Sequence, residues 1–205
     1  MSTGAKIALG IIGVIVLVVL IFGATIVGTY NTLVQLDQGV QSQWAQVENV
    51  YQRRSDLIPN LVNTVKGAAN FEQSTLTAVT EARAKVGQVT SGAVENIARD
   101  PQAFARFQQA QDGLSSALSR LMVVSERYPE LKATQNFRDL QVELEGTENR
   151  ISVERMRFNE SAQAFNTKRD TFPTVVIAGF FGSKFQEKPY FKAQTGAEKA
   201  PEVKF

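Results

Sequence analysis

Apolar residues recur at spacings of three and four along most of the chain, which is the spacing of one face of an α-helix. The stripe after residue 30 comprises Leu33, Leu36, Val40, Trp44, Val47 and Val50. The next comprises Leu57, Leu61, Val65, Ala68, Leu76, Val79 and Val86, and the third Phe104, Phe107, Leu114, Leu118, Leu121 and Val124. The last repeats every seven residues through Phe137, Leu144, Ile151, Phe158, Phe165 and Phe172. This pattern predicts an all-α domain, an antiparallel four-helix bundle with coiled-coil-like packing.

Turn residues divide these helices. GQVTSGAV (87–94) is small, polar and interrupted by glycine, which is typical of a loop. Asp100 before Pro101 indicates a helix start, because aspartate caps a helix and proline suits its first position. Tyr128 followed by Pro129 predicts the end of the third helix, since a residue before proline disfavours helical geometry.

The stretch RRSDLIPNLV (53–62) joins the first stripe to the second. One helix through both stripes would be about 85 Å long, and the later helices, about half that length, would not cover it. Asp56 suits the cap of a new helix and Pro59 its first turn, whereas the two arginines suit the negative end of the preceding helix. We therefore predict a corner at residues 53–59.

Residues 7–29 carry no charge and are apolar on every side of a helix. A helix of this length would extend roughly 34 Å, compared with roughly 30 Å of bilayer hydrocarbon. The apolar part of a signal peptide is shorter, at about 7–15 residues, and a core helix of a small domain keeps a polar face. The segment predicts a retained transmembrane anchor in contact with the lipid bilayer, after a short cytoplasmic N-terminus at residues 1–6.

Basic residues set the predicted orientation. Lys6 precedes the anchor, and the next basic residue is Arg53. Positive charge close to a span favours the cytoplasmic side. We therefore expect a single-pass protein whose helical domain, residues 30–171, lies outside the cytoplasm.

The chain after the last helix is expected back at the membrane, because a fourth helix returns toward the anchor. Residues 172–192 are therefore predicted at the membrane-proximal end, away from Tyr128. Their uncharged part, 175–182, is too short to span a bilayer, and three lysines follow it. It is interpreted either as a segment dipping into the membrane interface or as a strap that closes the bundle core. Residues 193–205 are predicted to be a flexible tail.

Two polar positions, Thr147 and Glu154, interrupt the apolar seam of the last helix. Around the first of them the segment TENR comprises Thr147, Glu148, Asn149 and Arg150. Polar groups in a seam need partners, and the candidates on the first helices are Arg53, Arg54, Asp56, Asn60 and Asn63. We expect an arginine–carboxylate contact between the first and last bundle helices. The site is either a polar layer that fixes helix register or a groove for a partner or ligand.

Composition argues against several kinds of chemistry. The chain has 205 residues, 43% hydrophobic and 20% charged, with a net charge of +2. This charge is too small to indicate nucleic-acid binding. Cysteine and histidine are absent, which removes thiolate metal sites, disulfides and the commonest general base. We expect no enzymatic activity, no metal and no cofactor.

Several motifs occur in a characteristic order: Tyr30-Asn31 after the anchor, Trp44, RRSDLIPNLV, YPELKA (128–133), FRDLQVELEGTENRI (137–151), FNE with Asn159, FN (165–166), Phe172-Pro173 and GFFG (179–182). Over residues 30–193 the sequence resembles the LemA family. The resemblance implies a bacterial membrane-anchored helical bundle. With the orientation indicated by Lys6, the bundle is expected on the periplasmic side of the inner membrane. The resemblance also implies a membrane protease or another envelope protein as partner, and structural or partner-binding roles for the motif residues. KGAANFE (66–72) departs from the family, which often has tyrosine and histidine there.

Two functions remain open from the sequence. The first is a membrane-anchored scaffold that forms a homo-oligomer through flat surfaces such as QQAQ (108–111), with a link to membrane-protein quality control. The second is a ligand-binding sensory bundle, which would need a second span and an output domain that the sequence does not show. The scaffold is favoured.

Overall fold

The computed structural model describes residues 3–67, 71–93 and 97–192, and helices make up nearly all of them. The long helices are α1 (Thr3–Lys66), α2 (Gln73–Ala93), α3 (Pro101–Ser125) and α5 (Gln135–Asp170). The short ones are α4 (Pro129–Ala133), α6 (Thr174–Phe180) and the 3-10 helix η1 (Gly182–Phe185), after which residues 186–192 are extended. No strand occurs within those three ranges, and the predicted all-α class is confirmed.

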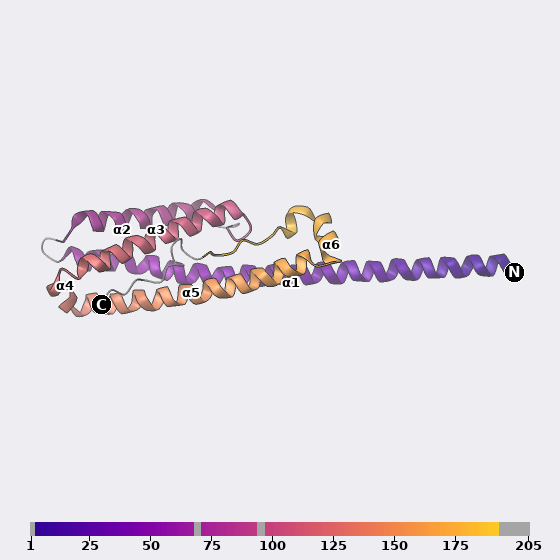
Figure 1. The fold of residues 1–205 in the computed structure, drawn as a ribbon, viewed down its shortest axis with the longest axis horizontal. Helices are drawn as coiled ribbons and strands as arrows, with labels where there is room; N and C mark the ends of the chain where they lie inside the picture. The colour runs from indigo at the N-terminus through magenta and orange to yellow at the C-terminus, as the bar shows by residue number, and fades with distance from the viewer. Residues whose placement is uncertain (1–2, 68–70, 94–96, 193–205) are drawn as a thin grey trace, which may run out of the picture.

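Helix α1 is one rod, with the other helices gathered along its C-terminal part (Figure 1). α5 lies along α1, and α2 lies along α3. Every described side chain from residue 9 to residue 28 is exposed, so the apolar N-terminal part of α1 projects alone. This part of α1 is long and apolar enough to cross a membrane. The same helix then enters the packed domain without interruption.

The predicted corner at residues 53–59 is wrong, because α1 continues as a helix to Lys66. Its buried stripe keeps alternating spacings of four and three through Leu33, Asp37, Val40, Trp44, Val47, Tyr51, Arg54, Ile58, Leu61 and Val65. A corner would have broken this phase. The expectation that the later helices would be too short to cover α1 is also wrong. The part of α1 after residue 29 is about 55 Å long, and the 36-residue α5 is about 54 Å long.

Pro59 is tolerated inside α1 because a side chain of α2 supplies the hydrogen-bond donor that proline lacks. Proline has no N–H, so the carbonyl of Ser55 loses its usual helical donor. The Nε of Arg83, on α2, donates to that carbonyl at 3.0 Å. Pro59 itself is exposed and lies outside the buried stripe, so its ring meets solvent.

The chain instead leaves α1 at Gly67 and enters the next helix at Gln73, where α2 begins. The N–H of Gly67 donates to the carbonyl of Thr64 at 3.3 Å, which closes the end of α1 with a tighter turn. The loop predicted at 87–94 is also wrong as far as residue 93, because α2 continues to Ala93, and residue 94 lies outside the described ranges. The hydroxyls of Thr90 and Ser91 donate to carbonyls one turn back in α2, which satisfies these polar side chains within the helix. The predicted start of α3 is confirmed, since the Asp100 carboxylate accepts from Gln102 N at 2.8 Å.

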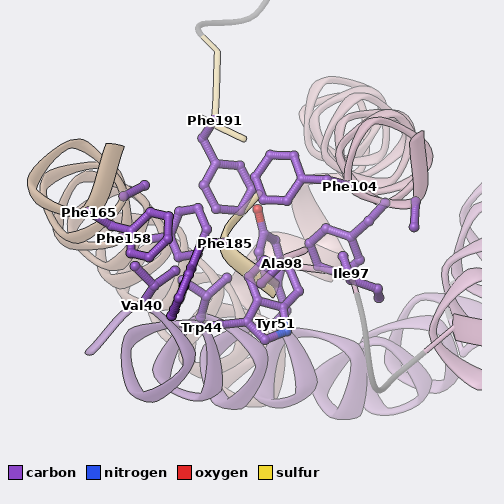
Figure 2. Packing of buried hydrophobic residues seen from close by; sticks show 14 of the residues in the cluster. Val40, Trp44, Tyr51, Ile97, Ala98, Phe104, Phe158, Phe165, Phe185 and Phe191 are labelled. Carbon is purple, nitrogen blue, oxygen red and sulfur yellow. The ribbon is translucent and has the colours of Figure 1, made fainter. Parts of the chain in front are cut away.

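Apolar side chains form two clusters along the domain. The proximal cluster, nearer the projecting part of α1, combines α1, α3, α5 and the C-terminal segment (Figure 2). Its aromatic centre includes Trp44, Phe104, Phe158 and Phe191, with 4.6 Å between the ring centroids of Phe104 and Phe191. The distal cluster combines the C-terminal part of α1 with α2, α3, α4 and the start of α5.

The C-terminal segment, residues 172–192, begins at the end of the domain from which α1 projects, where α6 lies, and its last residues run back along the domain (Figure 1). The ring centroids of Tyr30 and Phe181 are 4.9 Å apart, whereas Tyr128 packs against Phe71 at the other end. Phe181 therefore lies at the level of Tyr30. The tail predicted at residues 193–205 lies outside the described residues.

Candidate functional site

Arg54 is a buried cation at the centre of the domain, with 1% of its surface exposed. Its Nη2 donates to Gln111 Oε1 at 2.5 Å, and its Nη1 to Ser115 Oγ at 2.7 Å, both on α3. The same Nη1 donates to Glu148 Oε2, on α5, at 2.9 Å. Arg54 thus ties α1 to two other helices, and the predicted arginine–carboxylate contact between the first and last long helices is confirmed.

Three polar residues at core positions form a layer between the two apolar clusters. They are Arg54 on α1, Gln111 on α3 and Thr147 on α5, all buried. The Thr147 hydroxyl donates to the carbonyl of Glu143 in its own helix at 2.7 Å, so the partner expected from another helix is not needed. A helix that slipped by one heptad would move Arg54 into an apolar cluster, away from its hydrogen-bond partners. The layer therefore favours a single register of α1 against α3 and α5.

Other residues expected in this layer lie outside it. Arg53 contacts Glu143 at 2.8 Å on the surface, where both side chains are about half exposed. Asp56 accepts from Gln52 of its own helix at 2.8 Å, so the prediction that it faces TENR is wrong. Glu154 accepts from Gln43 at 2.7 Å and from Arg157, in its own helix, at 2.8 Å. The remaining candidates, all exposed, are Pro59, Asn60, Asn63, Asn149 and Arg150.

A second arginine extends the polar contacts along the edge of the proximal cluster. The Nε of Arg155 donates to the Tyr51 hydroxyl at 2.5 Å, and its Nη2 lies 3.3 Å from Asp112 Oδ1. Burial raises the pKa of Tyr51 above its ordinary value of 10.0, while the charges of Arg155 and Arg54 act in the opposite direction. The phenol therefore stays protonated to higher pH than it would in the unfolded chain.

Three side-chain amides hold the extended segment at residues 186–192 by its backbone. Asn166 Nδ2 donates to the carbonyl of Lys188 at 2.9 Å, and its Oδ1 accepts from the Lys188 N–H at 2.8 Å. Asn159 makes the same pair of bonds with Phe191, at 3.0 and 2.8 Å. Gln108, on α3, donates to the carbonyl of Lys192 at 2.9 Å. Paired bonds of this kind replace the backbone partners that an extended segment lacks.

From the last residue of η1 into this segment, buried side chains recur every third residue at Phe185, Lys188 and Phe191. Three residues per turn is the period of polyproline II, and Gln186, with φ −67° and ψ 152°, has that geometry. The ammonium of Lys188 is 2% exposed and lies 2.5 Å from Asp37 Oδ1. Burial of that charge is tolerated because the carboxylate compensates it.

The pairing of Asp37 with Lys188 was not predicted from the sequence. The spacing of the α1 stripe places Asp37 at a core position, so its burial was predictable. No local pattern indicates that Lys188 is buried. Arg99 also contacts the carboxylate of Asp37, at 2.9 Å, from the segment before α3.

The sequence model of the LemA family matches residues 43–205. The chain belongs to the LemA family. Magnetosome protein MamQ 2 of Paramagnetospirillum magneticum is 29% identical over 192 residues, which cover 85% of this chain and 71% of that protein. Magnetosome protein MamQ of Magnetospirillum gryphiswaldense is 28% identical with the same coverage. Protein LemA of Metamycoplasma hominis is 26% identical over 163 residues, covering 80% of this chain and 69% of that protein.

The other motif residues of this LemA-family chain lie at the two ends and in the proximal cluster. Trp44 is buried among aromatic rings, and half-buried Tyr30 meets the C-terminal segment. Pro129 begins α4 and follows Tyr128, which packs on Phe71. Exposed members are Asn31, Phe172 and Pro173. Partner-binding roles for these residues stay predictions.

The polar layer opens to the surface through a cleft of about 250 Å³ lined by α3 and α5. Pockets for small ligands are usually about 300–1,000 Å³, so this cleft is small for one. Within the described ranges, no three histidine, cysteine, aspartate or glutamate side chains group as they would to hold a metal. The contacts of Arg54 with α3 and α5 suit the layer to fixing these helices against α1.

Proposed function

We propose that this LemA-family chain is a membrane-anchored scaffold of the bacterial envelope that binds partner proteins through the outer faces of its helices. One observation carries the proposal: α1 runs unbroken from an uncovered apolar part into the core of the domain. Such a helix joins the domain to its anchor without a hinge. The absence of histidine and cysteine from the sequence supports binding over catalysis, with no cofactor.

In this proposal α1, α2, α3 and α5 act as an antiparallel four-helix bundle on the periplasmic side of the inner membrane. Lys6 before the apolar part supports that side. Protease added to spheroplasts should remove the domain while the anchor stays with the membrane. Complete protection of the domain by an intact inner membrane would place it in the cytoplasm.

Self-association is part of the proposal, but through a different surface from the one expected. QQAQ is not a free face, because Gln108 holds the C-terminal segment and Gln111 holds Arg54. The outer face of α5 instead carries a stripe at spacings of four and three, all exposed: Val142, Gly146, Asn149, Val153 and Met156. Copies anchored in one membrane share an orientation, so this stripe would meet its equivalent around a two-fold axis.

Substitutions on two exposed valines test this surface. Val153→Arg should reduce the detergent-solubilised mass from an oligomer to one protomer, because it places a charge in the proposed contact. Val123→Arg is the matched control, since Val123 is equally apolar and 69% exposed on α3. A single-protomer mass for the unaltered chain, in mild detergent and in nanodiscs, would count decisively against self-association.

A membrane protease or another envelope protein is the proposed further partner, with a role in membrane-protein quality control. The support is the family resemblance alone, and an unbiased crosslinking pull-down from membranes tests it. The alternative, a sensory bundle, is favoured by one observation, the cleft beside Arg54, where an anionic ligand would replace Glu148. Ligand-dependent stabilisation that Arg54→Met abolishes would favour this alternative.

A further inference from the structure

Helix α6 is apolar on both of its sides. Thr174, Ile177 and Ala178 face the protein and are buried. On the opposite side Val176 is 65% exposed and Phe180 is 86% exposed. A surface helix normally turns polar residues outward, and the only polar residue of α6 is the buried threonine. The outward side is therefore an uncovered apolar face.

The apolar face continues beyond α6. Phe172, two residues before it, is 79% exposed, and Val175 is 43% exposed. Phe172, Val176 and Phe180 are spaced by four residues, so within the helix the last two project to the same side. We call Phe172, Val175, Val176 and Phe180 the α6 patch. Its side chains are too large and too close together to be scattered surface residues.

The position of the α6 patch indicates what covers it. α6 stands beside α1 where the packed domain ends and the projecting apolar part begins (Figure 1). Tyr30, at that level of α1, packs on Phe181 with 4.9 Å between ring centroids. The ammonium of Lys184 lies 4.7 Å from the centre of the Tyr30 ring and donates to its hydroxyl. Tyrosine and lysine together are characteristic of the boundary between hydrocarbon and water.

We propose that the α6 patch is a second membrane contact, which lies in the interface of the bilayer beside the span of α1. The partner is the lipid bilayer itself, at the boundary between headgroups and acyl chains. The inference rests on the proposed anchoring through residues 7–29. It explains why α6 is apolar on both sides: one side packs on the domain and the other on lipid. Of the two interpretations of residues 175–182, this proposal takes the interfacial one.

Single-cysteine labelling tests the contact in the full chain, because the sequence has no cysteine of its own. Nanodiscs holding one copy each would carry a fluorophore at Val176→Cys, at Val16→Cys in the span, or at Val123→Cys as the distal exposed control. The quencher is a spin label attached to the upper acyl chain of the lipid. We expect the lipid quencher to remove most of the emission from labels at positions 16 and 176. It should leave the emission of the label at position 123 unchanged. Phe172→Ser with Phe180→Ser should restore emission at position 176 only.

The outcomes separate the two claims. Quenching at position 16 without quenching at position 176 overturns the membrane contact and leaves the anchor in place. No quenching at position 16 overturns both. If the label at 176 escapes lipid in one-copy discs but loses exposure to a water-soluble quencher in two-copy discs, a second copy covers the patch and the proposal is wrong.

Discussion

The contributions of Pro59 and Arg83 to stability should be coupled, and a double-mutant cycle measures the coupling free energy. The proline removes the donor that would reach the Ser55 carbonyl, and Arg83 Nε replaces it at 3.0 Å. Arg83→Ala should therefore be costly while Pro59 is present. Pro59→Ala gives the carbonyl a helical N–H again, so the arginine becomes dispensable. The cycle consists of the unaltered chain, the two single variants and the double variant.

The magnitude follows from the burial of the two groups. A hydrogen bond from a charged donor contributes about 1.5–3 kcal/mol, and the partly exposed guanidinium places this one toward the lower end. We expect Arg83→Ala to lower the free energy of unfolding by about 1.5 kcal/mol in the unaltered chain, and by less than about 0.5 kcal/mol beside Pro59→Ala. The coupling is then about 1 kcal/mol.

Urea unfolding of the full chain in nanodiscs provides the assay. Trp44 is the single tryptophan and is buried in the proximal cluster, so its emission reports unfolding of the domain. Lys85→Ala, an exposed lysine on the same helix as Arg83, controls for loss of a charge. Equal losses for Arg83→Ala with and without Pro59 would refute the compensation.

Three further predictions concern the polar contacts. Arg54→Ala should lower the free energy of unfolding by about 3 kcal/mol because Gln111 and Ser115 lose a buried donor, whereas Arg53→Ala should cost less than about 1 kcal/mol; equal urea midpoints would contradict this. Asn166→Ala should accelerate chymotryptic cleavage after Tyr190, while Asn149→Ala, at an exposed position, should not; unchanged cleavage of the first variant would show that the amide clamp is dispensable. Because the pKa of Tyr51 is raised in the folded state, the protein binds more protons than the unfolded chain above pH 10, and its stability falls as pH rises through that range. Tyr51→Phe should flatten this alkaline loss in unfolding curves, and an unchanged slope would remove Tyr51 as its source.

Sequence patterns predicted the features that depend on neighbouring residues. The apolar N-terminal helix, the start of α3 at Asp100 and the polar interruption at Thr147 all follow from local composition or helical period. The corner failed because Asp56 and Pro59 are good turn residues by themselves, while the continuing phase of the buried stripe through Arg54 is visible only over five turns or more. The uninterrupted spacing of the buried residues was the stronger evidence, since two helices separated by a corner rarely continue one spacing pattern.

Contacts between distant segments were beyond such patterns. The pairing of Asn166 with the backbone of Lys188 leaves no periodic signal, because its partner is a main chain of any sequence. The motif comparison marked the asparagines as distinctive without saying what they bind. The same limit applies to Arg83, whose carbonyl partner is 28 residues away.

If residues 7–29 are the anchor proposed above, the continuity of α1 also fixes the rotational angle of the domain about that anchor. Each residue of a helix turns the chain by about 100°, so one alanine inserted after Gly28 would swing the whole domain around the span, and four would nearly restore it. Ala24 and Gly28 form a small-residue pair in the proposed anchor, on which a partner's transmembrane helix would pack. The outer stripe of α5 stands at a fixed angle to that pair. A partner bound there within the bilayer would therefore meet one defined side of the domain outside it, because α1 fixes the angle between the two surfaces.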